Sequence, residues 1–276
     1  MEALQLDFTN THVLITGGAG YIGSSTVTAF LELNAYVTVL DLNPSKLRHV
    51  HPKLLPLKAD ISSEDSVESA FATATTKFGV PTVCIAMAGL DLSVLPHRES
   101  LIDMPLEQWR RTFQTNVEGT FLTARAWLKG INAHKDEELR NVSLVIVGSE
   151  SGTFGDRMNA DYASSKSAIQ FGLVQSLKGD VARIYPRARV NAIAPGPMDT
   201  KQFRLECTEN PEQLWLDSGA TTALGKPVPT LAVAKSIVFL ANETWSGHVT
   251  GQILNVDSGK HGKVMWTKEE HAEAFT

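Results

Sequence analysis

The chain has little cysteine and no long hydrophobic run. It contains two cysteines in 276 residues: Cys84 lies inside an apolar run and Cys207 in an expected loop, so we expect neither a disulfide framework nor a cysteine metal site. No apolar run approaches the roughly eighteen residues of a membrane span, so we expect no membrane partner. Residues 1–7 lack the basic region and apolar core of a signal peptide, which predicts a cytoplasmic protein.

Basic charge and clustered metal ligands are also lacking. A net charge of −5 and a pI near 5.9 give no reason to expect nucleic acid or an anionic membrane as a partner. The eight histidines are scattered without a metal-ligand spacing, so we expect no metal. What is present, 43% apolar and 20% charged residues without repeats or a dividing linker, is typical of one soluble globular domain over residues 1–276.

Short β-branched runs alternate along the chain with longer segments of helical period. The expected strands are 12–16, 35–40, 54–58, 83–87, 143–147, 189–193 and 252–256, and the expected helices are 22–33, 63–78, 107–128, 161–184 and 233–240. Apolar strands that do not alternate and are separated by helices indicate a parallel sheet covered on both faces. The sequence therefore predicts an α/β fold with a doubly wound Rossmann-type parallel sheet of about seven strands.

Two segments fall outside this alternation. The stretch from Pro195 to about residue 230 has no clear periodicity and is long for a plain connection, so we expect a substrate lid at about residues 196–230. Residues 260–276 follow the last expected strand and form a C-terminal extension.

A glycine-rich turn joins the first strand to the first helix. It carries Gly17, Gly20 and Gly23, with Tyr21 and Ile22 opening the helix. Glycines at this place let backbone N–H groups approach a pyrophosphate, and the helix N-terminus favours its negative charge. The alternative is a glycine-rich turn that binds no ligand. The position between a strand and a helix favours dinucleotide binding.

Acidic residues end the second and third expected strands. Asp41, eighteen residues past Gly23, is placed to accept hydrogen bonds from both hydroxyls of an adenosine ribose, and no arginine stands beside it. This favours NAD over NADP, although Asp41 could also be a solvated strand-end carboxylate. Asp60, followed by Ile61, could contact the adenine or act as a helix cap.

Tyr162 and Lys166 stand four residues apart in an expected helix. Side chains at this spacing share one face, and an ammonium beside a phenol lowers a tyrosine pKa toward the range useful for acid/base catalysis. With four tyrosines and fourteen lysines in the chain, such a pair also arises by chance. Ser149 lies thirteen residues earlier, at the end of an apolar run, and this position favours a functional pair over a chance one.

These motifs, taken in order, resemble the compact, single-domain branch of the short-chain dehydrogenase/reductase family, from about residue 10 to 259. Asn116-Val117-Glu118-Gly119 is similar to the family's asparagine motif and Ser149-Glu150-Ser151-Gly152 to its serine motif. The segment 191–200 resembles the part that contacts the nicotinamide carboxamide, and 255–259 ends in the compact-branch pattern.

The resemblance implies roles for these residues. Tyr162 would be the acid/base, Ser149 would donate to the substrate oxygen, Lys166 would also bond the nicotinamide ribose, and Asn116 would hold a water linking Lys166 to solvent. The further cofactor contacts that it implies are Ala88, Gly89, Pro195, Met198 and Thr200. By analogy with the family, the protein would be a homodimer or homotetramer.

Two departures stand out. Gly17-x-x-Gly20-x-x-Gly23 puts Tyr21 where the compact branch usually has its middle glycine, a pattern that resembles the epimerase and dehydratase branch. Ala86-Met87-Ala88-Gly89 replaces the frequent Asn-Asn-Ala-Gly. The second change removes two amide side chains and affects the detailed cofactor contacts rather than dinucleotide binding itself.

Residues near the expected site suggest a small-molecule pocket with apolar walls. Glu150, beside Ser149, either points away from the site or recognises a basic or hydroxylated substrate. The expected lining is Glu150, Phe154, Met158, Phe203 and Trp215. We therefore expect an NAD-dependent oxidoreductase that interconverts a secondary alcohol and a ketone. The alternatives are an NAD-dependent epimerase or dehydratase of the same fold, and a non-catalytic dinucleotide-binding sensor.

Overall fold

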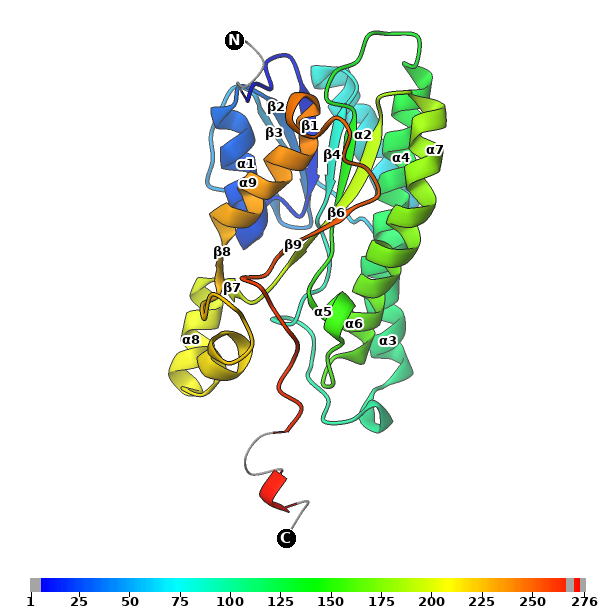
Figure 1. Ribbon diagram of the computed structural model, residues 1–276. Coiled ribbons are helices and arrows are strands. Elements are labelled where there is room, and N and C mark those ends of the chain that lie inside the picture. Colours follow the sequence, from blue (N-terminus) through cyan, green and yellow to red (C-terminus); the bar gives the residue numbers. More distant parts are fainter. Residues whose placement is uncertain (1–5, 267–270, 274–276) are drawn as a thin grey trace.

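The protein is described by a computed structural model over residues 6–266 and 271–273. One central sheet runs through the molecule in the order β3-β2-β1-β4-β5-β6-β9, and all its strands are parallel (Figure 1). The strands are β1 (His12–Thr16), β2 (Tyr36–Asp41), β3 (Leu54–Lys58), β4 (Val83–Ala86), β5 (Ser143–Val147), β6 (Arg189–Pro195) and β9 (Ile253–Val256). The predicted fold class is confirmed.

Helices cover both faces of the sheet. In Figure 1, α1 and α9 lie on one side, and α2, α4 and α7 on the other. The longer helices are α1 (Tyr21–Glu32), α2 (Glu64–Phe78), α3 (Leu106–Phe113), α4 (Gly119–Ala133), α6 (Ala160–Ser167), α7 (Val174–Ile184), α8 (Lys201–Glu209) and α9 (Thr230–Ala241). Short helical turns are η2 (Pro44–Lys46), η3 (Leu101–Asp103), α5 (Ser151–Phe154) and α10 (Glu243–Ser246). No helix of the described residues is long and apolar enough to cross a membrane.

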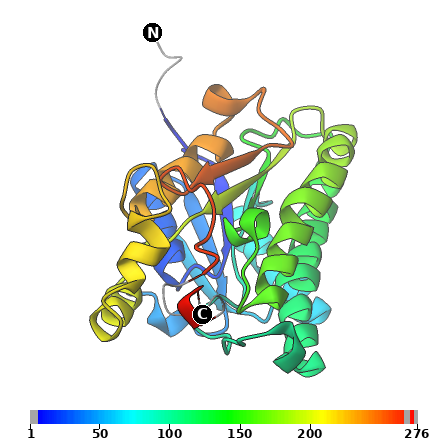
Figure 2. The same cartoon turned by 60° about the horizontal axis from the view of Figure 1, so that its bottom comes forward.

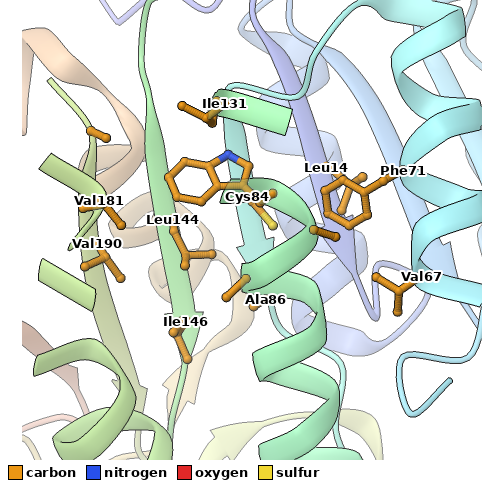
Figure 3. Close-up of a cluster of buried hydrophobic side chains, with 14 of the residues drawn as sticks. Leu14, Val67, Phe71, Cys84, Ala86, Ile131, Leu144, Ile146, Val181 and Val190 are labelled. Carbon is orange, nitrogen blue, oxygen red and sulfur yellow. The ribbon is translucent and has the colours of Figure 1, made fainter. Parts of the chain in front are cut away.

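The core forms two layers, one on each face of the sheet. Successive strand residues point to opposite faces, so Leu14 packs in one layer while its neighbours Val13 and Ile15 pack in the other. Figure 3 shows the first layer, where Leu14 and Leu144 from the sheet face Phe71 of α2 and other helix residues. Burial on both faces explains why most strand positions are apolar and why apolar and polar residues do not alternate along the strands.

Two long helices are interrupted by π-helical turns. The sequence predicts one helix over 107–128, and the structure has α3, the π-helical turn η4 (Gln114–Glu118) and α4 in unbroken succession. The predicted helix over 161–184 contains a second such turn, η5 (Ala168–Leu173), between α6 and α7. A π-helical turn accommodates one extra residue, a feature frequent at functional sites, and local hydrophobic spacing does not reveal it.

The stretch from Pro195 to residue 230 is more regular than expected. It contains β7 (Met198–Asp199), helix α8, the π-helical turn η6 (Trp215–Gly219) and β8 (Val228–Pro229). Thr200 caps α8, because its hydroxyl accepts a hydrogen bond from the N–H of Phe203 at 3.1 Å. These elements lie beyond the carboxyl end of β6, and the red C-terminal segment runs between them and α5 (Figures 1 and 2).

Candidate active site

The parallel strands end at one edge of the sheet, and the predicted site residues follow those ends. In an open parallel sheet, ligands bind outside the carboxyl ends, where the strand order reverses. Here the order reverses between β1 and β4. The glycine turn follows β1, Asp41 ends β2, Gly89 follows β4 and Ser149 follows β5. The topology therefore brings residues far apart in sequence to one edge.

The glycine turn needs glycine for steric reasons. Gly17 has φ +71°, and a Cβ there would lie 2.8 Å from the Ala88 Cα. At Gly23 a Cβ would lie 2.2 Å from the Gly17 carbonyl oxygen, so the first turn of α1 packs directly on the loop. Gly20 is the N-cap of α1 and provides no side-chain cap. A helix start without a capping side chain or an acid in its first turn suits a bound phosphate.

Asp41 supports the glycine turn as well as the end of β2. One of its carboxylate oxygens accepts from the Ala19 N–H at 3.0 Å, and the other accepts from the Asn43 N–H at 2.9 Å. Each carboxylate oxygen has two acceptor positions, which leaves capacity for ribose hydroxyls. The carboxylate is partly exposed, and the next residue, Leu42, is exposed.

Asp60 and Ile61 follow β3. The Asp60 carboxylate accepts from both the N–H and the hydroxyl of Ser62, while Ser63 is the N-cap of α2. The side chain of Ile61 is buried against Gly119, where a Cβ would lie 2.7 Å from the Ile61 Cδ1. The Asp60 carboxylate thus holds the turn before α2, and the Ile61 side chain packs against the start of α4.

The loop after β4 is held by a residue that the sequence reasoning did not single out. The Thr16 hydroxyl, at the end of β1, accepts from the N–H groups of Met87 at 3.0 Å and Ala88 at 3.1 Å. This contact fixes the Ala86-Met87-Ala88-Gly89 segment against the glycine turn. A Cβ at Gly89 would lie 3.0 Å from the Asn116 Oδ1 and 3.7 Å from the Lys166 Nζ.

Asn116 is buried in the π-helical turn η4. Its side-chain oxygen accepts from the Leu90 N–H at 2.7 Å, and its amide donates to the Leu90 carbonyl at 3.0 Å and to the Ser165 hydroxyl at 3.1 Å. The Asn116 carbonyl accepts from the Thr120 hydroxyl at 2.7 Å. The side chain therefore ties the loop after β4 to helix α6.

Gln170 is the second residue that the sequence reasoning missed. It is fully buried on η5, and its side-chain oxygen accepts from the Ser149 N–H at 2.6 Å. Its side chain also occupies the space next to Gly148 and Gly152, where a Cβ would lie 2.0 and 2.9 Å from Gln170 atoms. Gln170 thus holds the turn that carries Ser149. The sequence signal for this role is an amide side chain inside an otherwise apolar helical segment.

Tyr162, Ser149 and Lys166 meet in a buried group. The hydroxyls of Ser149 and Tyr162 are hydrogen-bonded. Lys166 donates to the Val147 carbonyl at the end of β5 at 2.9 Å, and its Nζ lies 5.7 Å from the centroid of the Tyr162 ring. The helical spacing therefore places the phenol and the ammonium on one face, next to the serine.

The pKa of Tyr162 is raised well above its usual value, chiefly because the phenol is buried. The hydrogen bond from Ser149 opposes this rise, whereas the negative charges of Asp91, Glu150 and Asp156 add to it. The lowering by a lysine that the sequence predicts is not found in this structure.

Burial affects Lys166 as well. Burial lowers its pKa from 10.5 to about 8, so the ammonium loses its proton near neutral pH more readily than an ordinary lysine does. The four-residue spacing of Tyr162 and Lys166 does not predict these pKa shifts, because the burial that causes them depends on the whole fold.

The residues expected to line a pocket lie on several segments. Phe154 ends α5, Met158 precedes α6, Phe203 is on α8 and Trp215 begins η6. Phe154, Met158 and Trp215 are exposed, and Phe203 is half-buried. Glu150 is buried, and its carboxylate pairs with Lys263 of the C-terminal segment at 2.9 Å.

The remaining predicted residues belong to the end of β6 and the segment after it. Pro195 ends β6, and its carbonyl accepts from the Glu150 N–H at 2.9 Å, which links β6 to the serine turn. Met198 lies in β7, and Thr200 caps α8. Within the described residues, no group of three or more histidine, cysteine or acidic side chains is placed to hold a metal.

The fold and the site together define a dinucleotide-binding oxidoreductase, and comparison with known proteins gives its family. The family model described as enoyl-(acyl carrier protein) reductase, of the short-chain dehydrogenase/reductase family, matches residues 18–261. The chain therefore belongs to the short-chain dehydrogenase/reductase family, as its motifs predict. Members of this family use nicotinamide dinucleotides.

Relatives cover nearly the whole chain. Short-chain dehydrogenase reductase 3a of Arabidopsis thaliana is 31% identical over 94% of this chain and 97% of its own length. Cis-4-hydroxycyclohexanecarboxylate dehydrogenase of Sinomonas cyclohexanicum is 29% identical over 91% and 97%. The crystal structure of a short-chain type dehydrogenase/reductase from Mycobacterium marinum has the same fold, with a TM-score of 0.79, 24% identity, and coverage of 94% of this chain and 98% of that one.

Proposed function

We propose that the protein is an NAD-dependent oxidoreductase that interconverts a secondary alcohol and a ketone on a small organic substrate. The observation that carries this proposal is the buried group of Ser149, Tyr162 and Lys166 at the carboxyl edge of the sheet. A binding module has no need of a phenol hydrogen-bonded to a serine beside a lysine.

In this proposal each residue has one task. Tyr162 takes the proton from the alcohol, or gives one to the ketone, and Ser149 donates a hydrogen bond to the same oxygen, where charge develops. Lys166 stabilises the deprotonated phenol and bonds the nicotinamide ribose. The Asn116 main chain holds the water that returns the proton to solvent. A nicotinamide held by these residues would supply the hydride exchange with the substrate carbon.

The residues present fit a nicotinamide dinucleotide. A Cβ at Gly17 or Gly23 would collide with the backbone, so the chain stays close to the place of a pyrophosphate, and α1 starts without a side-chain cap. The residues proposed to contact the cofactor are Gly17, Gly20, Tyr21, Ile22, Gly23, Asp41, Asp60, Ile61, Ala88, Gly89, Tyr162, Lys166, Pro195, Met198 and Thr200.

The preference for NAD rests on Asp41. A carboxylate held beside the glycine turn by the Ala19 N–H would repel a 2′-phosphate and accept hydrogen bonds from the ribose hydroxyls. We also propose that residues 196–230 form the substrate lid and that Glu150, Phe154, Met158, Phe203 and Trp215 contribute to the pocket. The working form would be a cytoplasmic homodimer or homotetramer.

One experiment tests the core of this proposal. Thermal unfolding is measured with NAD, NADH, NADP and NADPH, beside a redox screen of secondary alcohols and ketones. The screen includes cis-4-hydroxycyclohexanecarboxylate and glucose, which the names of relatives suggest. Selective stabilisation by NAD(H) together with turnover is the expected result. Binding without redox chemistry would favour the epimerase alternative, and no binding would overturn the cofactor assignment.

A further inference from the structure

The C-terminal segment docks on its own chain beside the active site. Lys260 pairs with Thr222 in an antiparallel bridge, and the His261 N–H donates to the Thr221 carbonyl at 2.9 Å. The Ala223 N–H donates to the Gly259 carbonyl at 3.0 Å. In Figure 2 this segment, drawn in red, comes forward and passes beside the short helix α5. The segment is therefore attached to the proposed lid by main-chain hydrogen bonds.

Lys263 of this segment reaches the turn that follows Ser149. Its Nζ lies 2.9 Å from the Glu150 Oε1 and 3.4 Å from the Asp156 Oδ2, and 3.5 Å from the Ser151 hydroxyl. The two acids flank α5 on the stretch between Ser149 and Tyr162. Both are largely withdrawn from water, since their side chains are 7% and 15% exposed.

Lys260 lies close by and has other partners. Its Nζ donates to the Asp217 carbonyl at 2.6 Å and to the Thr221 hydroxyl at 2.8 Å, and stays 3.9 Å from the nearer Glu150 oxygen. Among the residues that the structure describes, Lys263 is therefore a cation in hydrogen-bonding contact with Glu150 and within 4 Å of Asp156.

The two acids act on the phenol from a distance. The charges of Glu150 and Asp156 oppose ionisation of Tyr162, as does the charge of Asp91 on the loop after β4. Lys166 lies over the Tyr162 ring from the same helix. Asp161, the residue before Tyr162, accepts hydrogen bonds from Gln108 and Thr112 of α3.

We propose that Lys263 is a positioning residue of the active site: its ammonium holds Glu150 and Asp156 beside the serine turn and offsets part of their negative charge, so that they oppose the loss of the Tyr162 proton less than they would without it. This inference rests on the proposed function, because it requires Tyr162 to be the acid/base. It also explains the acidic residue next to Ser149. Glu150 serves as an anchor for the C-terminal segment, which thereby completes the site.

The test is the pH profile of alcohol oxidation, measured with NAD and the alcohol that the wild-type protein oxidises fastest in the screen. Rates for wild type, Lys263→Gln and Lys263→Arg are compared. In Lys263→Gln the rising limb of the rate-against-pH profile should move to higher pH by about half a pH unit or more. The reason is that both carboxylates lose the ammonium of Lys263, although Glu150 keeps a second one nearby, that of Lys260 at 3.9 Å. Lys263→Arg should keep the wild-type limb, since it keeps the charge.

A double variant separates charge from packing. Lys263→Gln combined with Glu150→Gln removes one positive and one negative charge, so its limb should return toward that of the wild type. Lys235→Gln, on an exposed position of α9, is the matched control and should leave the profile unchanged. A limb that does not move in Lys263→Gln, or that moves equally in Lys235→Gln, would overturn the inference, as would a uniform loss of rate at every pH.

The two proposals fail in different ways. Wild-type protein that oxidises no alcohol, or Tyr162→Phe that retains activity, would overturn the proposed function. A wild-type profile that depends on Tyr162 but is insensitive to Lys263 would overturn only this inference. Thermal unfolding of each variant shows whether it is folded under the assay conditions.

Discussion

Tyr162 is buried, hydrogen-bonded to Ser149 and placed over Lys166, and these contacts define what its removal should do. Tyr162→Phe keeps the ring and deletes the hydroxyl. Turnover should fall by about a hundredfold to ten-thousandfold, because the proton transfer loses its acid/base. NADH affinity, measured by fluorescence titration, should stay within about a factor of two or three. Activity close to that of the wild type would show that another group transfers the proton.

Asp41 determines the choice between the two dinucleotides in our proposal. Asp41→Ala combined with Leu42→Arg removes the charge that repels a 2′-phosphate and supplies one that binds it. The ratio of kcat/KM for NADP to that for NAD should rise by at least about tenfold, which is about 1.4 kcal/mol of transition-state binding. Wild-type protein that already prefers NADPH would contradict the assignment.

Residues also mark the limit of sequence reasoning. Ser149, Tyr162 and Lys166 are apparent from one local stretch, since a helix places positions four apart together. Gln170 lies 21 residues from Ser149, and Lys263 joins the same turn from the far end of the chain. Folding brings these partners to the serine turn, so no local sequence pattern shows that they contact it. The raised pKa of Tyr162 was missed for the same reason, because burial belongs to the whole fold.

At the scale of elements, the glycine turn offers a test with an internal control. Gly23→Ala would place its Cβ 2.2 Å from the Gly17 carbonyl oxygen, so the loop must shift away from α1. NAD affinity should fall at least about tenfold, about 1.4 kcal/mol. Gly179→Ala in α7 meets no atom within 4 Å and should raise stability by about 0.5 to 1 kcal/mol without affecting NAD. Titration calorimetry and chemical denaturation give the two quantities, and unchanged NAD binding in Gly23→Ala would contradict the assigned loop.

The π-helical turn η5 offers a second test at this scale. Gln170→Leu keeps a side chain of similar size and removes the acceptor for the buried Ser149 N–H. Stability should fall by about 1 to 3 kcal/mol, and kcat should fall more than NAD affinity, because the serine turn is no longer held. A loss of stability without any change in kcat would limit Gln170 to a structural role. Urea denaturation and steady-state kinetics measure both.

At the scale of elements, the sequence predicts the order of strands and helices well and the interruptions poorly. The apolar runs and helical periods are local properties, and every predicted strand is present within one or two residues at each end. The turns η4, η5 and η6 and the helix α8 were not anticipated. Hydrophobic spacing does not reveal the π-helical turns, and α8 has no buried residue that would give it an apolar period.

For the whole molecule, a buried histidine links stability to pH. His12 of β1 contacts the Gly79 carbonyl at 2.7 Å and the Thr38 hydroxyl at 2.9 Å, and burial lowers its pKa from 6.5 to about 4. The unfolded chain therefore binds a proton first as the pH falls. The resulting stabilisation is complete above pH 6.5 and is lost as the pH falls from 6.5 to 4, by about 3 kcal/mol.

This link is measured by denaturant unfolding of wild type and His12→Gln across that pH range. The difference between the two unfolding free energies should shrink as the pH falls, because the variant has no histidine to charge. Parallel curves would show that the pKa of His12 is the same in the folded and the unfolded protein. Other acidic groups affect both proteins alike and cancel in the difference.

The π-helical turn η4 has a consequence for how the sequence can change over time. An α-helix rotates about 100° per residue, so removing one residue from η4 would restore the ordinary period and turn α3 relative to α4 by that angle. Gln108 and Thr112, which bond Asp161 beside Tyr162, would then face elsewhere. A single-codon deletion in this turn is thus a change of helical phase, and it should be tolerated only with a compensating insertion in the same helix.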